Sequence, residues 1–141
     1  MHKFNFFSCL LVLLLFGCTS EGSMKKVDSY IFLHDNSSKM WLVDKLLINK
    51  NDYTPMRFRY KQLIIFHESR NAYFYRLHEF GDKTGIKSTY SMDRTTNEFR
   101  FQIGKKEWIF DIQLMTRTKV VLRPKYNSYP YTMVLIPFPE Y

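Results

Sequence analysis

Short segments of β-forming residues, each ended by turn residues, recur along most of this chain and limit what it can fold into. Helical 3.6-residue and heptad periodicities are almost absent from the same region. Most of the connections between the segments have hairpin length, so consecutive strands should pair antiparallel in a meander. The predicted strands cover residues 40–48, 58–67, 72–80, 86–92, 98–103, 107–115, 119–123 and 131–138.

The alternation of apolar and polar residues predicts which face of each strand is buried. In residues 98–103 the aromatic and aliphatic side chains alternate with Glu98, Arg100 and Gln102. The predicted buried positions are Phe99, Phe101, Ile103, Trp108, Phe110, Ile112 and Leu114, with Tyr73, Tyr75 and Leu77 in the third segment. Strands with one buried and one solvent-exposed face predict an all-β, antiparallel, eight-stranded up-and-down barrel, with an antiparallel β-sandwich as the alternative.

The N-terminal stretch has the order of an export signal. Lys3 precedes an apolar run from Phe6 to Phe16, which is 11 residues long. Signal-peptide cores have roughly 7–15 apolar residues, whereas a membrane-spanning helix needs about 20. We therefore predict a signal peptide and not a transmembrane anchor.

The end of this signal, Leu15-Phe16-Gly17-Cys18, resembles the lipobox of bacterial lipoproteins. The resemblance implies cleavage before Cys18, attachment of acyl chains to this cysteine and anchoring in a membrane. Thr19 is not the aspartate that is associated with inner-membrane retention, which implies an outer-membrane location, facing the periplasm or the cell surface. An ordinary secretory signal followed by a chance cysteine is the alternative.

Three regions follow from this reading: a signal peptide in residues 1–17, a polar tether in residues 18–29 and one β domain in residues 30–141. With Cys9 removed and Cys18 acylated, no disulfide can form, so the domain must be stabilised by its hydrophobic core. Aromatic residues, 18% of the chain, can supply that core.

The formal charge of the chain is +8. In an envelope this charge suits acidic lipids, glycans or proteins and not nucleic acid, or it simply keeps the domain soluble.

Two stretches carry a second resemblance. Met40-Trp41-Leu42-Val43 at the first strand, and the run from Trp108 to Leu122, are similar to the small lipocalin-like domains of bacterial envelope proteins. The chain departs from that family at Lys39-Met40, where a glycine usually precedes the tryptophan. The resemblance implies a barrel that can hold a small molecule.

Two functions are compatible with such a barrel. The first is a non-catalytic binding module for a small apolar or amphiphilic ligand; its candidate lining residues are Trp41, Phe99, Phe101, Trp108 and Phe110, although for any one of them a purely structural role in the core is favoured. The second is a structural or interaction subunit of an envelope protein assembly, with a filled barrel and contacts through the loops rich in tyrosine and proline at residues 124–131 and 137–141.

Catalytic and metal-binding patterns are weak. His67-Glu68 and His78-Glu79 are eleven residues apart on strands, and a hairpin turning at Arg70 would pair His78 with Gln62, so no shared metal site is expected. His34-Asp35 could join a hydrolytic triad, but no Gly-x-Ser-x-Gly motif accompanies it. We therefore expect no cofactor, no metal and no enzymatic activity, with a hydrolase as the less favoured possibility.

The stretch Arg57-Phe58-Arg59-Tyr60-Lys61 alternates cations with aromatic residues. On a strand, this pattern favours aromatic side chains inside the barrel and cations outside, because an unpaired buried cation is costly. The opposite orientation would place Arg59 and Lys61 inside, where they would suit an acidic or amphiphilic ligand.

Overall fold

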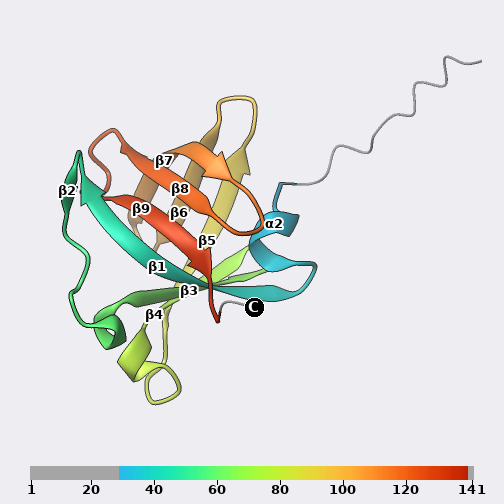
Figure 1. The fold of residues 1–141 in the computed structure, drawn as a ribbon. Coiled ribbons are helices and arrows are strands. Elements are labelled where there is room, and N and C mark those ends of the chain that lie inside the picture. Colours follow the sequence, from blue (N-terminus) through green and yellow to red (C-terminus); the bar gives the residue numbers. More distant parts are fainter. Residues whose placement is uncertain (1–28, 140–141) are drawn as a thin grey trace, which may run out of the picture.

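The computed structural model describes residues 29–139, which form a closed antiparallel barrel (Figure 1). Each strand pairs with the next along the chain, and β1 pairs with β9 to close the sheet. The barrel strands are β1 (Ser38–Ile48), β3 (Gln62–His67), β4 (Asn71–Arg76), β5 (Ile86–Asp93), β6 (Glu98–Ile103), β7 (Lys106–Met115), β8 (Val120–Lys125) and β9 (Thr132–Pro137). The predicted eight-stranded up-and-down barrel is confirmed, and closure rules out the sandwich.

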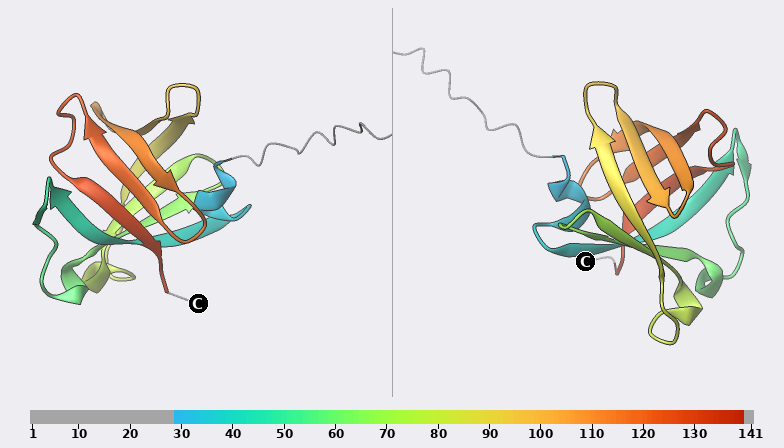
Figure 2. Two further views of the ribbon diagram at one scale, coloured as in Figure 1. Left: turned by 45° about the horizontal axis from the view of Figure 1, so that its top comes forward. Right: turned by 180° about the vertical axis from the view of Figure 1, so that it is seen from behind.

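Short elements distinguish the two ends of the barrel. Helix α2 (Ile31–His34) lies at one end, which we call the closed end: Leu33 is fully buried there, and its carbonyl accepts a 3.0 Å hydrogen bond from Trp41 Nε1. The 3₁₀ turns η1 (Phe58–Tyr60) and η2 (Leu77–Glu79) lie side by side at the other, open end (Figure 2). The short strand β2 (Asn51–Asp52) pairs with the end of β1.

Aromatic rings fill the interior of the barrel. The Phe101 ring lies at its centre, with ring centroids 4.9 Å from Phe99 and 5.0 Å from Phe74. Edge-to-face and offset arrangements of this kind add to the free energy gained by burying the apolar area. The inward-facing residues that are buried include Trp41, Val43, Ile64, Phe66, Phe74, Tyr90, Phe99, Phe101, Phe110, Ile112, Leu122, Met133 and Leu135.

The predicted burial is wrong at Leu114 and for one face of β4. Leu114 is 41% exposed, because the pairing of β7 with β8 shifts between Ile112 and Leu114 and this irregularity turns the following side chain outward. In β4, Ala72 and Phe74 are the buried residues, and the alternate residues Tyr73 and Tyr75 lie on the outer side.

The predicted strands at residues 58–67 and 72–80 are shorter than expected. Residues 58–60 turn because the amides of Tyr60 and Lys61 donate to the carbonyls of Arg57 and Phe58. The last backbone bond between the two segments runs from the Leu77 amide to the Lys61 carbonyl, at 2.9 Å. The strand ladder therefore ends where η1 and η2 begin.

The predictions for the signal peptide and Cys18 fall outside the described residues. Among residues 29–139, no helix is long and apolar enough to cross a membrane.

Candidate binding site at the open end of the barrel

The register between β3 and β4 places two polar residues on the inner face of the sheet at the open end of the barrel. Gln62 pairs with Arg76 across β3 and β4. Both positions continue the inward-facing alternation, since Ile64 and Phe66 are inward in β3 and Phe74 is inward in β4. The sheet thus supplies one amide and one guanidinium at the mouth of an otherwise apolar barrel.

A cavity of about 360 Å³ lies at this mouth. Its lining consists of Val43, Leu46, Pro55, Tyr60, Gln62 and Arg76. A neighbouring hollow of about 290 Å³ shares Gln62 and Arg76 and continues to Phe74 and Ile86. Cavities of a few hundred Å³ with a mainly apolar wall and a few polar groups suit small organic ligands.

The charge on Arg76 is available to a ligand. Its side chain is exposed, and among residues 29–139 it makes no hydrogen bond or ion pair. The nearby Glu79 is paired with Lys83 at 3.0 Å; this hydrogen bond lowers the pKa of Glu79 most, and the charges of Lys83, His78 and Arg76 add to the effect. Tyr60 is held in place beside it by an edge-on contact with the His78 ring, at 5.0 Å between centroids, and by a 2.7 Å hydrogen bond from Arg59 to its hydroxyl. Ile86, which pairs with Phe74, is 61% exposed, so this side of the mouth is open to solvent.

Tyr129 covers a neighbouring part of the open end. Its ring centroid lies 4.5 Å from that of Trp108 and 5.7 Å from that of Phe110. The loop is fixed by Ser128, whose hydroxyl accepts from the Ile109 amide at 2.8 Å and donates to the Ile109 carbonyl at 3.0 Å. Burial, and the nearby Tyr131, raise the pKa of the Tyr129 hydroxyl. Tyr129 therefore seals the aromatic interior and leaves the cavity on the side of β3 and β4.

The predicted lining residues lie deeper than this cavity. Trp41, Phe99, Phe101 and Phe110 are fully buried in the aromatic interior, and Trp108 is partly buried beneath Tyr129. None of the five lines the mouth cavity. Their role in binding stays a prediction, and the structure brings together a different set around Gln62 and Arg76.

Sequence reasoning missed Arg76 because it placed Tyr73 and Tyr75 on the inner face. The alternation Ala72, Phe74, Arg76 was the available signal, since small and apolar residues at the first two positions indicate the buried face.

Comparison with protein-family models, with curated proteins and with solved structures found no match.

The histidines do not assemble a site. The hairpin pairs Gln62 with Arg76, so the predicted pairing of Gln62 with His78 is wrong by two residues. His67 ends β3 at the closed end, while His78 lies in η2 at the open end. Within residues 29–139, no group of three or more histidine, cysteine, aspartate or glutamate residues is placed to hold a metal ion.

His34 and His78 are hydrogen-bonded to other groups. His34 Nδ1 accepts from the Asn36 amide at 3.0 Å, and His78 Nδ1 lies 3.0 Å from the Arg59 carbonyl oxygen. His78 Nε2 lies 3.6 Å from the carboxylate of the adjacent Glu79, but in the described part of the chain no histidine side chain forms a hydrogen bond with a serine hydroxyl.

Arg59 and Lys61 do not line the interior. Arg59 is exposed beside Tyr60, and Lys61 forms a 3.2 Å ion pair with Asp44. The outward orientation expected for the cations is confirmed, but Phe58 and Tyr60 are also exposed, at 54% and 39%. In η1, therefore, both the cations and the aromatic residues of the alternating stretch are exposed to solvent.

A larger hollow, about 690 Å³, is an open groove on the outer wall of the barrel. Leu47, Val121 and Val134 form its apolar floor. The arginine at its edge, Arg123, is paired with Asp111 at 3.4 Å. Because Arg123 is already paired with a carboxylate, we expect this groove to attract an acidic ligand less strongly than the mouth cavity does.

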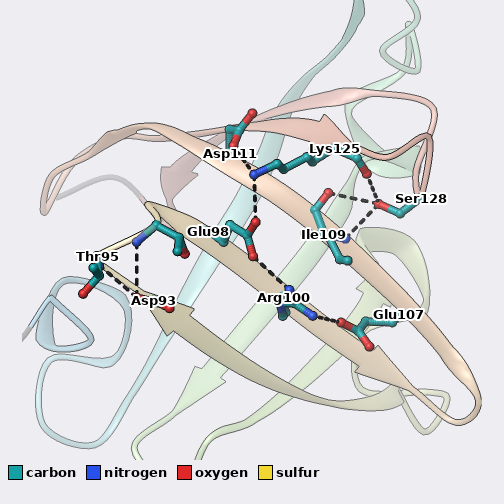
Figure 3. A network of polar contacts seen from close by, with 10 residues as sticks. Asp93, Thr95, Glu98, Arg100, Glu107, Ile109, Asp111, Lys125 and Ser128 are labelled. Carbon is teal, nitrogen blue, oxygen red and sulfur yellow. Dashed lines mark hydrogen bonds and ion pairs between the residues drawn. The ribbon is translucent and has the colours of Figure 1, made fainter.

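Charged residues on the outer face of β6, β7 and β8 form one network (Figure 3). Glu98 accepts from Lys125 Nζ at 2.7 Å and from Arg100 Nη2 at 2.9 Å; Arg100 also donates to Glu107, and Lys125 lies 3.6 Å from Asp111. Hydrogen bonds from Lys125 and then Arg100 lower the pKa of Glu98, against the effect of burial, and Glu98 raises the pKa of Lys125. Each carboxylate faces a cation, so the network ties three strands together.

We expect Glu98→Gln to destabilise the barrel at neutral pH. Because the pKa of Glu98 is lower in the folded chain than its ordinary value of 4.5, the stabilisation is fully present above pH 4.5. It is lost as the pH falls from there through the folded pKa. The difference in unfolding free energy between wild type and variant should therefore shrink in acid, as measured by denaturant titration.

Glu68→Gln is the matched control, since Glu68 is exposed in the turn between β3 and β4. A Glu98→Gln effect that is the same in acid as at neutral pH, or no larger than that of Glu68→Gln, would contradict the prediction.

Proposed function

We propose that the mature chain is a lipid-anchored lipoprotein of the bacterial envelope, held in the outer membrane through Cys18. We further propose that its lipocalin-like barrel binds one small amphiphilic molecule and catalyses no reaction. The observation that carries the binding proposal is the mouth cavity, in which an apolar wall meets the guanidinium of Arg76, an exposed group without a hydrogen bond or ion pair in residues 29–139.

The chemistry of the cavity selects the kind of ligand. Val43, Leu46 and Pro55 offer a surface for a short apolar tail. Arg76 can donate two parallel hydrogen bonds to a carboxylate or a similar acidic head, and Gln62 can supply a further donor. The aromatic packing beneath excludes a long tail from the barrel axis. An acidic amphiphile with a short tail fits these limits.

A second candidate function is a structural or interaction subunit of an envelope protein assembly. The filled interior below the mouth favours it, because a barrel without a deep cavity can act through its surface alone. Native mass spectrometry of the detergent-extracted full chain separates the two: a bound small molecule supports the first, and a stoichiometric protein partner supports the second.

The role of Arg76 can be tested by calorimetry with decanoate and decanol, which share a tail and differ in head charge. The chain starting at Cys18 and carrying Cys18→Ser is suitable, because every strand pairing of the barrel lies within residues 38–137. We expect Arg76→Gln to weaken decanoate binding about fivefold, as for a solvent-accessible ion pair, and to leave decanol binding nearly unchanged.

Arg94→Gln is the control, since Arg94 lies in the turn between β5 and β6 at the closed end. Equal losses for decanoate in both variants, or no binding of decanoate to the wild type, would refute a carboxylate site at the mouth.

A further inference from the structure

The segment from Met56 to Tyr60 is exposed at five consecutive positions, although three of its side chains are large and apolar. Met56 is 103% exposed and Phe58 54% exposed. Arg57 and Arg59 alternate with them, and no acidic residue occurs from Tyr53 to Lys61. Nothing in the mouth cavity requires Met56, Arg57 or Phe58, so this segment is unexplained by the proposed binding site.

A second exposed segment lies next to it. Turns η1 and η2 are in contact at the open end, as Figures 1 and 2 show from opposite sides. Phe80 and Ile86, which follow η2, are 44% and 61% exposed. We call Met56, Arg57, Phe58, Arg59, Tyr60, Phe80 and Ile86 the open-end surface.

The charged residues of this surface, Arg57 and Arg59, are both cations. The acidic residues beside it are Glu79, which is paired with Lys83, and the exposed Asp82. The Arg57 side chain makes no hydrogen bond or ion pair within residues 29–139; only its backbone carbonyl accepts a bond, from the Tyr60 amide. Arg59 is bonded to the Tyr60 hydroxyl and lies 4.8 Å from that ring, so its charge is not neutralised. Lys83 and Lys61, by contrast, are each paired with a carboxylate. The uncompensated cations of the open end are therefore interleaved with its exposed apolar side chains.

We propose that the open-end surface docks on a lipid bilayer that contains anionic headgroups. Arginines beside an anionic surface are attracted to it, while methionine, phenylalanine and tyrosine side chains enter the boundary between headgroups and acyl chains. A bilayer also accommodates a small projecting turn, whereas a stable protein partner would require a larger complementary face of roughly 800 Å² on each side.

This contact would hold the mouth cavity against the lipid. Tyr60 belongs both to the surface and to the cavity lining, and Pro55 of the lining directly precedes Met56. An amphiphile could then pass between the bilayer and the site beside Arg76 without crossing water. The docking itself rests on η1 and its neighbours and does not depend on the cavity being occupied.

The test uses the Cys18→Ser chain from residue 18 onward, which has no acyl group and no cysteine. Met56→Cys introduces a single site for a polarity-sensitive fluorophore. Leu114→Cys is the matched control, because Leu114 is 41% exposed on β7, away from η1. On vesicles of phosphatidylcholine with phosphatidylglycerol, the label at position 56 should shift to shorter wavelength and the label at 114 should not.

Charge and apolar contributions can be separated by flotation with the same vesicles. Arg57→Glu with Arg59→Glu should weaken binding at least tenfold, since each arginine near an anionic surface contributes roughly a fivefold factor. Arg94→Glu with Lys119→Glu, two exposed positions in turns at the closed end, makes the same change of charge and should lose much less. Phe58→Ser should also weaken binding several-fold.

Three outcomes would overturn the inference: no binding to vesicles with phosphatidylglycerol, equal binding to vesicles of phosphatidylcholine alone, or capture by an acidic protein without any vesicle binding. A chain that binds decanoate but no vesicle would refute the docking and leave the proposed ligand site standing.

Discussion

Phe101→Ala should lower the unfolding free energy of the barrel by about 3–5 kcal/mol, the range for removing a buried large aromatic side chain. Phe101 is fully buried, and its ring contacts five others, among them Phe66, Phe74 and Phe99. The rigid closed sheet cannot collapse around the missing ring, so most of the cavity should remain. For a domain of this size the melting temperature should fall by roughly 10–20 °C.

Phe58→Ala provides the comparison, because Phe58 is 54% exposed; its ring lies 6.2 Å from that of Phe138, and Lys61 Nζ lies 5.8 Å from its centroid. Its effect should stay below about 1 kcal/mol. Trp108→Ala should fall between the two, since Trp108 is partly buried and remains covered by Tyr129. Similar melting temperatures for Phe101→Ala and Phe58→Ala would contradict the packed interior.

Cys18→Ala should abolish acyl labelling of the full chain and release the domain from the membrane fraction. Each buried methylene of an acyl chain contributes about 0.8 kcal/mol, so the loss of two or more chains removes stable anchoring. Labelling with a radioactive fatty acid, followed by fractionation, measures both effects. A high-salt wash belongs in the procedure, because the open-end surface should give weak, salt-sensitive attachment.

Cys9→Ala is the control, since Cys9 lies before the predicted cleavage site. It should leave labelling and anchoring unchanged. Acyl labelling that persists in Cys18→Ala, or membrane attachment that survives the salt wash, would refute the lipid anchor.

Strand positions could be predicted because they depend on local composition. Alternating residues such as Phe99 and Phe101 specify a half-buried strand, and short polar connections specify antiparallel neighbours. The shift after Ile112 could not be predicted, because a bulge depends on how two strands of different curvature fit together. Leu114 is exposed for that reason, although its own pattern resembles that of its buried neighbours.

The sequence predicted the type of binding site but not the residues that form it. The sequence indicated a barrel that could hold an amphiphile, and it singled out the cations and aromatic residues of 57–61. It did not indicate Arg76, because a one-residue error of register in β4 moves every side chain of that strand to the other face. The exposure of Phe58 also depended on where the β3–β4 ladder ends, which is set by pairing between the two segments.

The amino-acid sequence by itself determined that this chain forms an antiparallel β-meander with an aromatic interior, since periodicity and turn residues act over a few neighbouring positions. Only the tertiary structure decided that the interior is filled, that β1 closes on β9, and that Gln62, Arg76 and Tyr60 meet around a cavity at the open end. Closure and register are long-range properties: the free energy of packing many rings at once selects them, and no single segment encodes that selection.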